Sequence, residues 1–164
     1  MINICNKINC CGCNACVQIC PQKCIIMEED YEGFLYPKIE LQKCINCRLC
    51  EKVCPVLNRF SSSTVLDSYA CYTYNEYIQE KSSSGGIIYE ISKYVLEKKG
   101  IVCGACFDEN WEVFHSCVDN VEDSVKFRGS KYVQSKIGDV YSHVKDYLKE
   151  GKYVLFIGTP CQVS

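Results

Sequence analysis

The sequence CCGCNACVQICP over residues 10–21 decides the fold of the first part of the chain, because it occurs twice. The second copy, CINCRLCEKVCP, spans residues 44–55, and both copies read C-x2-C-x2-C-x3-C-P. Eleven of the sixteen cysteines lie within the first 54 residues, so the two copies organise a cysteine-rich N-terminal region. A proline follows the last cysteine of each copy and is expected to end a short helix there.

Three cysteines at this spacing suit a [4Fe–4S] cluster, which binds four thiolates. The loop wraps around one cluster, and in two-cluster ferredoxins the fourth thiolate comes from the other copy. The ligands predicted by this rule are Cys10, Cys13, Cys16 and Cys54 for one cluster, and Cys44, Cys47, Cys50 and Cys20 for the other. Zinc sites usually group cysteines in pairs rather than triplets. A zinc fold or a disulfide framework is the alternative explanation of the same residues.

The other cysteines do not fit the two-cluster spacing. Those interpreted as small apolar residues that pack are Cys5, Cys11, Cys24, Cys71 and Cys117. Residues 103–106, CGAC, have the spacing of a thioredoxin-like redox pair, but such a pair needs a thiol at a helix N-terminus, where the dipole lowers its pKa. The flanking apolar residues predict a strand instead, which favours packing for Cys103 and Cys106. His115 is likewise interpreted as structural rather than catalytic.

The 164 residues carry 18 basic and 20 acidic side chains, a formal net charge of -2. Proteins that bind nucleic acid or anionic membranes need an excess of Lys and Arg, so we predict neither as a partner. The apolar runs are too short to span a bilayer. The N-terminus lacks the basic and apolar segments of a secretion signal. We therefore expect a cytoplasmic protein without a membrane span.

We predict a two-domain α+β fold: a bacterial-type two-cluster ferredoxin domain at 1–58, a polar linker at 59–66 and a partial α/β domain at 67–164. Two apolar runs around Glu32-Gly33 predict a β-hairpin between the cysteine loops, and a helical turn is expected after each loop. In the second domain the periodicity predicts strands at 69–73, 101–107, 112–118 and 153–158, and helices at 87–95 and 137–150. The last helix and strand predict at least one strand–helix–strand crossover.

The second domain has neither a G-x-G-x-x-G sequence nor a P-loop, so it lacks both common nucleotide fingerprints. Residues 82–86, SSSGG, precede a helix, where small residues and exposed N–H groups can hold a phosphate. A plain serine N-cap is the simpler explanation of this segment alone. Residues 128–132, RGSKY, offer two cations and hydrogen-bond donors around a glycine, as a solvated turn also would.

The order of these motifs resembles that of one family. EGFLYP at 32–37, SSGG at 83–86, RGSKYVQS at 128–135 and GTPCQ at 158–162 together resemble the coenzyme F420 hydrogenase/dehydrogenase beta-subunit family. The resemblance covers essentially the whole chain. Family members of this architecture carry FAD together with [4Fe–4S] clusters. They pass electrons between a deazaflavin or other two-electron partner and one-electron carriers.

The resemblance also implies cofactor-binding positions, which are Ser84, Gly85, Gly86, Arg128, Ser130, Lys131, Thr159, Cys161 and Gln162. It predicts no catalytic residue, and the chain is expected to be an oxidoreductase subunit or a fragment that lacks the family's C-terminal half. The expected partners are a redox protein or flavoenzyme subunit and a deazaflavin or nicotinamide-type coenzyme. The alternative is a stand-alone ferredoxin-like electron carrier whose α/β part only docks to a partner.

Overall fold

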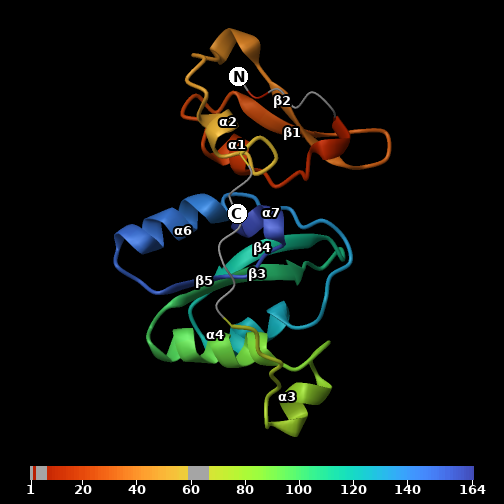
Figure 1. The fold of residues 1–164 in the computed structure, drawn as a ribbon, viewed down its shortest axis with the longest axis vertical. Coiled ribbons are helices and arrows are strands. Elements are labelled where there is room, and N and C mark those ends of the chain that lie inside the picture. Colours follow the sequence, from red (N-terminus) through yellow and green to blue (C-terminus); the bar gives the residue numbers. More distant parts are fainter. Residues whose placement is uncertain (1, 3–6, 59–66) are drawn as a thin grey trace. The chain divides into compact units, whose positions relative to one another are not determined.

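The computed structural model describes residues 2, 7–58 and 67–164 (Figure 1). Two sequence-based expectations fall elsewhere: the polar linker at 59–66 and the packing role of Cys5 lie outside the described residues.

The chain forms two compact units. The first comprises residues 1–63 together with residues 159–164, and the second comprises residues 64–158. The sequence-based prediction assigns residues 159–164 to the second domain, whereas the structure groups them with the first. A cysteine-rich unit with a small hairpin and a unit with a mixed sheet and helices confirm the predicted two-domain α+β fold.

An antiparallel hairpin supports the first unit. Strands β1 (Ile25–Glu29) and β2 (Leu35–Ile39) pair in the register that sets the first residue of β1 opposite the last of β2. The carboxylate of Asp30 accepts two backbone N–H groups of the connecting turn, each at 3.0 Å. Gly33 adopts φ +86°, which a glycine tolerates without steric cost. The predicted hairpin is therefore confirmed.

The sequence repeat is also a structural repeat. Helices α1 (Ala15–Gln18) and α2 (Leu49–Lys52) each contain the third cysteine of their copy, Cys16 or Cys50. Asn14 and Arg48, which occupy the same position in the two copies, both adopt the left-handed conformation, with φ 66° and 60°. The two loops therefore turn into their helices in the same way. Short 3-10 helices precede each copy, η1 (Lys7–Asn9) and η2 (Leu41–Lys43).

Cysteine side chains supply most of the apolar core of the first unit. Its buried residues in the described part are Ile2, Cys16, Cys24, Ile25, Cys50 and Cys54. A domain of this size buries little apolar surface and commonly needs metals or disulfides for stability. The composition of this core is therefore what a metal-stabilised domain requires.

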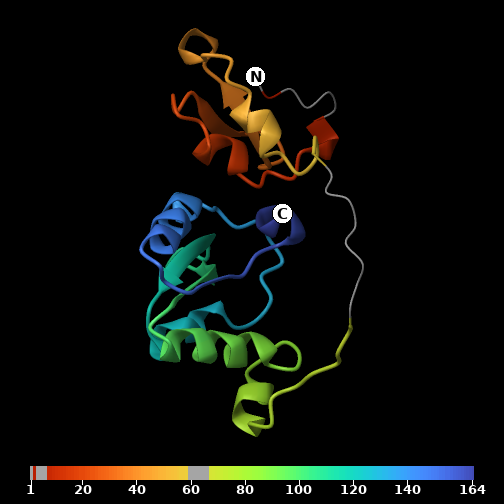
Figure 2. The same cartoon turned by 60° about the vertical axis from the view of Figure 1, so that its left-hand side comes forward.

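A three-stranded sheet with a helix on each face forms the second unit (Figures 1 and 2). Its strand order is β4 (Val113–Val118), β3 (Ile101–Phe107), β5 (Val154–Phe156). Strand β3 pairs antiparallel with β4 and parallel with β5, which confirms the predicted crossover. Helix α4 (Ile87–Glu97) covers one face and α6 (Val140–Lys149) covers the other.

Alternation along β3 assigns its side chains to the two faces. Val102 and Cys106 pack with Leu96 of α4, whereas Cys103 packs with Val140 of α6. All five of these residues are buried. Both faces of the central strand are therefore core. The remaining helices are α3 (Glu76–Glu80), α5 (Val121–Ser124) and η3 (Val125–Phe127) in the second unit, and α7 (Pro160–Val163) in the first.

Two predicted elements of the second unit differ from the structure. Residues 69–73, predicted as a strand, are extended but pair with no strand among the described residues. Residues 71–73 of this segment pack instead on the loop before α4, where the Thr73 N–H donates to the Gly85 carbonyl at 2.7 Å. The helix predicted at 137–150 begins at Val140, because Ile137 belongs to the segment that enters it.

Four cysteines depart from the role of small packed residues with a free thiol. Cys103 and Cys117 face each other across β3 and β4 and form a disulfide, so the interpretation of Cys117 as a packed thiol is wrong. Cys11 and Cys71 are exposed rather than packed. Cys106 is 1% exposed within β3, which confirms the packing interpretation for this residue.

Candidate functional site

The first of two cysteine-lined cavities lies beside the first cysteine loop. Cys10, Cys13 and Cys16 of the first copy line it together with Cys54 of the second copy. These are the four thiols that the two-cluster spacing predicts as one ligand set. Cys11 also lines the cavity, and its sulfur lies 3.8 Å from the Asn9 carbonyl.

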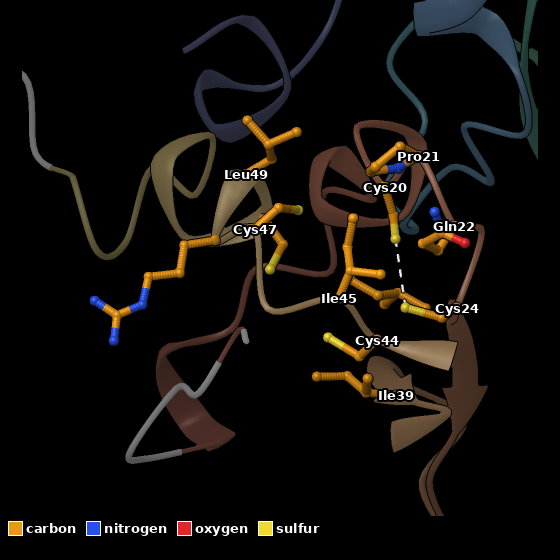
Figure 3. A pocket seen from close by; sticks show the side chains of 12 residues that line it. Cys20, Pro21, Gln22, Cys24, Ile39, Cys44, Ile45, Cys47 and Leu49 are labelled. Atoms are coloured by element: carbon orange, nitrogen blue, oxygen red, sulfur yellow. Dashed lines mark hydrogen bonds between the residues drawn. The ribbon is translucent and has the colours of Figure 1, made fainter. Parts of the chain in front are cut away.

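The second cavity repeats this arrangement with the copies exchanged. Cys44, Cys47 and Cys50 of the second copy line it together with Cys20 of the first (Figure 3). A fifth cysteine, Cys24, points into the same cavity. The sequence interpretation treats Cys24 as an ordinary packed residue, because its spacing lies outside the repeated motif.

Backbone amides of the first loop are directed at its sulfur atoms. The N–H of Gly12 donates to the sulfur of Cys10, and the N–H of Ala15 donates to that of Cys13. Each bond stabilises the thiolate form, yet burial outweighs it and raises the pKa of both thiols. The loop therefore offers preformed donors to negative sulfur atoms that lie in a poorly solvated place.

Burial acts most strongly on Cys16. It raises the pKa of this thiol from 9.0 to about 12, and the neighbouring Cys13 and Cys10 add to the effect. Four thiolates in such a cavity are stable only with a positive group among them. A bound metal would supply that charge, and its binding would drive the loss of the thiol protons.

Cys20 behaves in the opposite way. Burial alone would raise its pKa, but hydrogen bonds from the backbone and the thiol of Cys24, and from the N–H groups of Gln22 and Lys23, lower it overall. Burial raises the pKa of Cys24 to about 11, and its hydrogen bonds with Cys20 and Cys44 contribute. Of these two thiols, Cys20 is therefore the one that ionises more readily.

Neither cavity has the geometry of a site for one ion. Among the described residues, no three His, Cys, Asp or Glu side chains converge as they would around a single metal. A zinc ion needs thiolate sulfurs about 2.3 Å away. A four-iron cluster, by contrast, binds each thiolate at a separate iron. The ligand assignment therefore depends on which thiols share a cavity, and it stays a prediction.

The second unit brings two of the predicted cofactor-binding segments together. The Ser130 hydroxyl donates to the Ser83 hydroxyl at 3.2 Å. The Arg128 guanidinium lies over the Tyr89 ring of α4, 4.3 Å from its centroid. Within the described residues, the buried Nε of Arg128 has no hydrogen-bond partner. The sequence interpretation quoted Ser83 within the SSGG motif without assigning it to the cofactor, and it missed Tyr89, because both roles depend on this contact between distant segments.

Lys131 completes this group of polar side chains. Its ammonium donates to the Arg128 carbonyl at 2.8 Å and to the Lys126 carbonyl at 3.2 Å. Burial lowers the pKa of Lys131. A partly desolvated cation on the same loop as Arg128 suits an anionic ligand. We refer to Ser83, Arg128, Ser130 and Lys131 as the basic loop site.

The glycines before α4 have a packing role of their own. A Cβ on Gly85 would lie 2.3 Å from the Cys71 carbonyl oxygen. Gly86 adopts φ +76°, and a Cβ there would lie 2.7 Å from a methyl group of Thr73. These glycines therefore permit residues 71–73 to pack closely on the loop, which is sufficient to explain their presence. The side chain of Ser84 is exposed beside them.

The GTPCQ motif forms the start of α7. Thr159 and Gln162 form a capping box, in which the Thr159 N–H donates to the Gln162 side chain at 2.9 Å. Such reciprocal bonds satisfy N–H groups that a helix start leaves without partners. The Cys161 sulfur lies 3.2 Å from the Thr159 hydroxyl. These residues belong to the first unit, whereas the basic loop site belongs to the second.

Comparison with known families agrees with the two units. Residues 9–58 match the family described as "4Fe-4S dicluster domain", and residues 68–141 match "Coenzyme F420 hydrogenase/dehydrogenase, beta subunit N-term". The second unit is thus similar to the N-terminal part of this F420-linked family. The resemblance predicted from the sequence is thereby confirmed. The first unit is an iron–sulfur electron-transfer domain of the ferredoxin type.

Curated relatives of the F420-linked type match nearly the whole chain. The chain is 26% identical over 162 residues to one of the subunits of "F(420)H(2) dehydrogenase" from Methanosarcina mazei, a match that covers 93% of this chain and 46% of the relative. It is 29% identical over 163 residues to "Coenzyme F420-dependent sulfite reductase" of Methanocaldococcus jannaschii, covering 94% and 24%. The chain thus spans half or less of these relatives.

The first unit has relatives of its own. A "Ferredoxin" of Saccharopolyspora erythraea is 36% identical over 74 residues, which is 44% of this chain and 65% of the ferredoxin. Among the helices of the described residues, none combines the length and apolar character needed to cross a bilayer.

Proposed function

We propose that this chain carries single electrons through two [4Fe–4S] clusters, as a subunit or part of a flavin-dependent oxidoreductase of the F420 hydrogenase/dehydrogenase beta-subunit type. One observation carries the proposal: each cavity is lined by three cysteines of one copy and one cysteine of the other. The proposed ligands are Cys10, Cys13, Cys16 and Cys54 for the first cluster, and Cys44, Cys47, Cys50 and Cys20 for the second.

The donor set supports iron–sulfur clusters on chemical grounds. All eight proposed ligands are thiols, the donor that such clusters require. The N–H groups of Gly12 and Ala15 point at sulfur atoms of the first set. Hydrogen bonds of this kind stabilise negative charge on the ligands and tune the reduction potential. The protein would thus hold each cluster and set its potential, while the iron supplies the one-electron chemistry.

The second unit is proposed to hold the phosphates of a flavin at the basic loop site. Arg128 and Lys131 supply positive charge, and Ser130 supplies a hydroxyl. The buried Nε of Arg128, which has no partner among the described residues, is a donor that an anion would satisfy. FAD, when bound, exchanges electron pairs with one partner and single electrons with another. The other proposed flavin neighbours are Ser84, Gly85, Gly86, Thr159, Cys161 and Gln162.

The partners follow from this chemistry. The two-electron partner is proposed to be a deazaflavin or nicotinamide-type coenzyme, and a redox protein or flavoenzyme subunit exchanges the single electrons. The names of the F420-linked relatives support the deazaflavin. The cytoplasm is the proposed location.

Anaerobic purification of the full chain tests the proposal. We expect about eight iron and eight sulfide per chain, because two four-iron clusters are proposed, together with bound flavin after incubation with FAD. Iron and sulfide assays, the visible spectrum and chromatography of released flavin measure these quantities. Colourless protein with zinc or paired thiols in place of iron would overturn the cluster assignment.

A second candidate is an electron carrier whose α/β unit only docks to a partner. The close packing of residues 71–73 on Gly85 and Gly86 favours it, because this packing explains the two glycines without a cofactor. Protein that holds about eight iron but never retains FAD would establish this candidate over the flavin-dependent one.

A further inference from the structure

The single tryptophan of the chain lies on the turn that joins β3 and β4, and its side chain is largely exposed. Trp111 is 79% exposed. Its ring makes an edge contact with the ring of Phe107, with 5.7 Å between the centroids and 63° between the planes. Phe107, the last residue of β3, is itself 45% exposed. These two large rings therefore keep much of their surface available to a ligand.

The turn holds Trp111 in a conformation that does not favour its side chain. The Asp108 carboxylate accepts the N–H groups of Asn110 and Glu112 at 2.9 and 2.8 Å. The Asp108 carbonyl accepts the Trp111 N–H at 3.2 Å. Trp111 adopts φ 63°, which a glycine tolerates without steric cost and a bulky residue rarely adopts. Neither burial nor the geometry of the turn therefore explains a tryptophan at this position.

A cation connects the two rings with the basic loop site. The Lys131 ammonium lies 5.9 Å from the centroid of the Phe107 ring. The same ammonium donates to the Arg128 carbonyl at 2.8 Å, within the basic loop site. A planar ring that is joined to a phosphate at this site would therefore have Phe107 and Trp111 within reach.

We propose that Phe107 and Trp111 form the subsite for the adenine ring of FAD. Nucleotide bases stack on exposed aromatic side chains, and this stacking contributes strongly to binding. Trp111 stacks on the adenine, while the edge contact with Phe107 orients the indole. The inference rests on the proposed flavin site, and it adds the half of the cofactor that FMN lacks. Trp111 thus selects FAD over FMN.

A second pair of exposed rings has the same geometry without the cation. The rings of Tyr72 and Tyr74 lie 5.7 Å apart at 65°, and both residues are exposed. The cation–ring contacts within the described part of the chain involve neither tyrosine. Tyr74→Ala is therefore a matched control, because it removes an exposed ring that has no neighbouring cation.

Fluorescence of the full chain, purified anaerobically, tests the subsite directly, because Trp111 is its single tryptophan. ADP carries the adenine and the two phosphates of FAD without the flavin. We expect ADP to quench the fluorescence of Trp111 as the adenine stacks on it. Inorganic pyrophosphate, which has no ring, should compete with ADP and leave the fluorescence nearly unchanged.

Variants then measure the contribution of the ring by calorimetric titration. Trp111→Ala should weaken ADP and FAD binding about tenfold and leave FMN binding unchanged, because only the adenine loses its stacking partner. Trp111→Phe should weaken ADP binding less, and Tyr74→Ala should not weaken it. Trp111→Gly should weaken ADP binding as Trp111→Ala does, with a urea midpoint no lower than that of wild-type protein, since glycine suits the positive φ. That result separates loss of the ring from damage to the turn.

Unchanged ADP and FAD affinities in Trp111→Ala overturn the inference while leaving the flavin site intact. An equal loss of FMN affinity also overturns it, because Trp111 would then contact the flavin ring instead of the adenine. A loss of ADP affinity in Tyr74→Ala as large as that in Trp111→Ala overturns the selectivity of the subsite. Wild-type protein that binds neither ADP nor FAD overturns the proposed flavin site together with the inference.

Discussion

Removal of iron should leave Cys16 as a thiol that resists ionisation. Burial, with a contribution from neighbouring cysteines, raises the pKa of Cys16 from 9.0 to about 12. A shift of about three pKa units is about 4 kcal/mol against the thiolate, at about 1.36 kcal/mol per unit. Near pH 8, the thiolate fraction in the folded, iron-free protein should therefore be about a thousandfold lower than in the unfolded chain.

The sign of the pH dependence follows from the raised pKa. The folded state favours the protonated thiol, so its stabilising contribution is fully present below the ordinary pKa of 9.0. That contribution is lost as the pH rises through about 12. The iron-free first unit should therefore become less stable at alkaline pH, unlike the iron-loaded unit, in which Cys16 is proposed to bind iron as a thiolate.

Alkylation by iodoacetamide, mapped by peptide mass spectrometry from about pH 7 to 11, measures this shift, because only the thiolate reacts. In denaturant, the alkylation rate of Cys16 should stop increasing at a pH just above the ordinary pKa of the thiol. In the folded, reduced, iron-free protein, this rate should still increase with pH over the whole range. Cys20 is the matched control, because its hydrogen bonds lower its pKa and its rate should level off earlier. If Cys16 levels off at the same pH in both states, the cavity does not exist without iron and the reasoning is refuted.

Three further predictions concern other residues. Gly85→Ala should lower the free energy of unfolding of the second unit by about 3 kcal/mol in urea, because the added Cβ would clash with a carbonyl oxygen. The control Gly129→Ala adds a Cβ that contacts no atom, and it should lower the free energy of unfolding by about 1 to 2 kcal/mol because of the positive φ. Equal losses of stability in the two variants would contradict the packing described. Cys47→Ser should remove one cluster, with a loss of about four iron at most, whereas Cys103→Ser should leave both clusters intact. Iron loss from Cys103→Ser would show that Cys103 has a role at a cluster. Arg128→Ala should weaken FAD binding about tenfold in a fluorescence titration, because a charged hydrogen bond is lost. Arg128→Lys should weaken FAD binding less. Unchanged FAD affinity in Arg128→Ala would contradict flavin binding at the basic loop site.

The repeated cysteine motif could be interpreted from sequence because its geometry is local. Three cysteines at x2 spacing curl one loop, and the matched left-handed residues Asn14 and Arg48 show that both copies do so alike. The hairpin and the strands β3, β4 and β5 were equally predictable, since alternating or continuous apolar residues select the strand. These elements depend little on what packs against them.

The failures involve contacts between distant segments. Residues 69–73 have strand-like composition, but a strand requires a partner, and residues 71–73 pack on Gly85 instead. The Cys103–Cys117 disulfide depends on the register of β3 and β4, in which the two residues lie directly opposite. A slip of one residue would separate them, so cysteine spacing alone could not predict the bond.

The two copies of the motif differ most just after their last cysteine, where the sequence alone does not predict which side chains are buried. Up to Cys20 and Cys54 the copies match position by position, and spacing predicts which thiols share a cavity. Four residues later, Cys24 turns inward and is 1% exposed, whereas Asn58 is exposed and bonded to backbone carbonyls. That difference arises because the hairpin anchors one copy and not the other. Two loops with equivalent predicted ligands therefore differ in the side chains beside their last cysteines, Cys20 and Cys54.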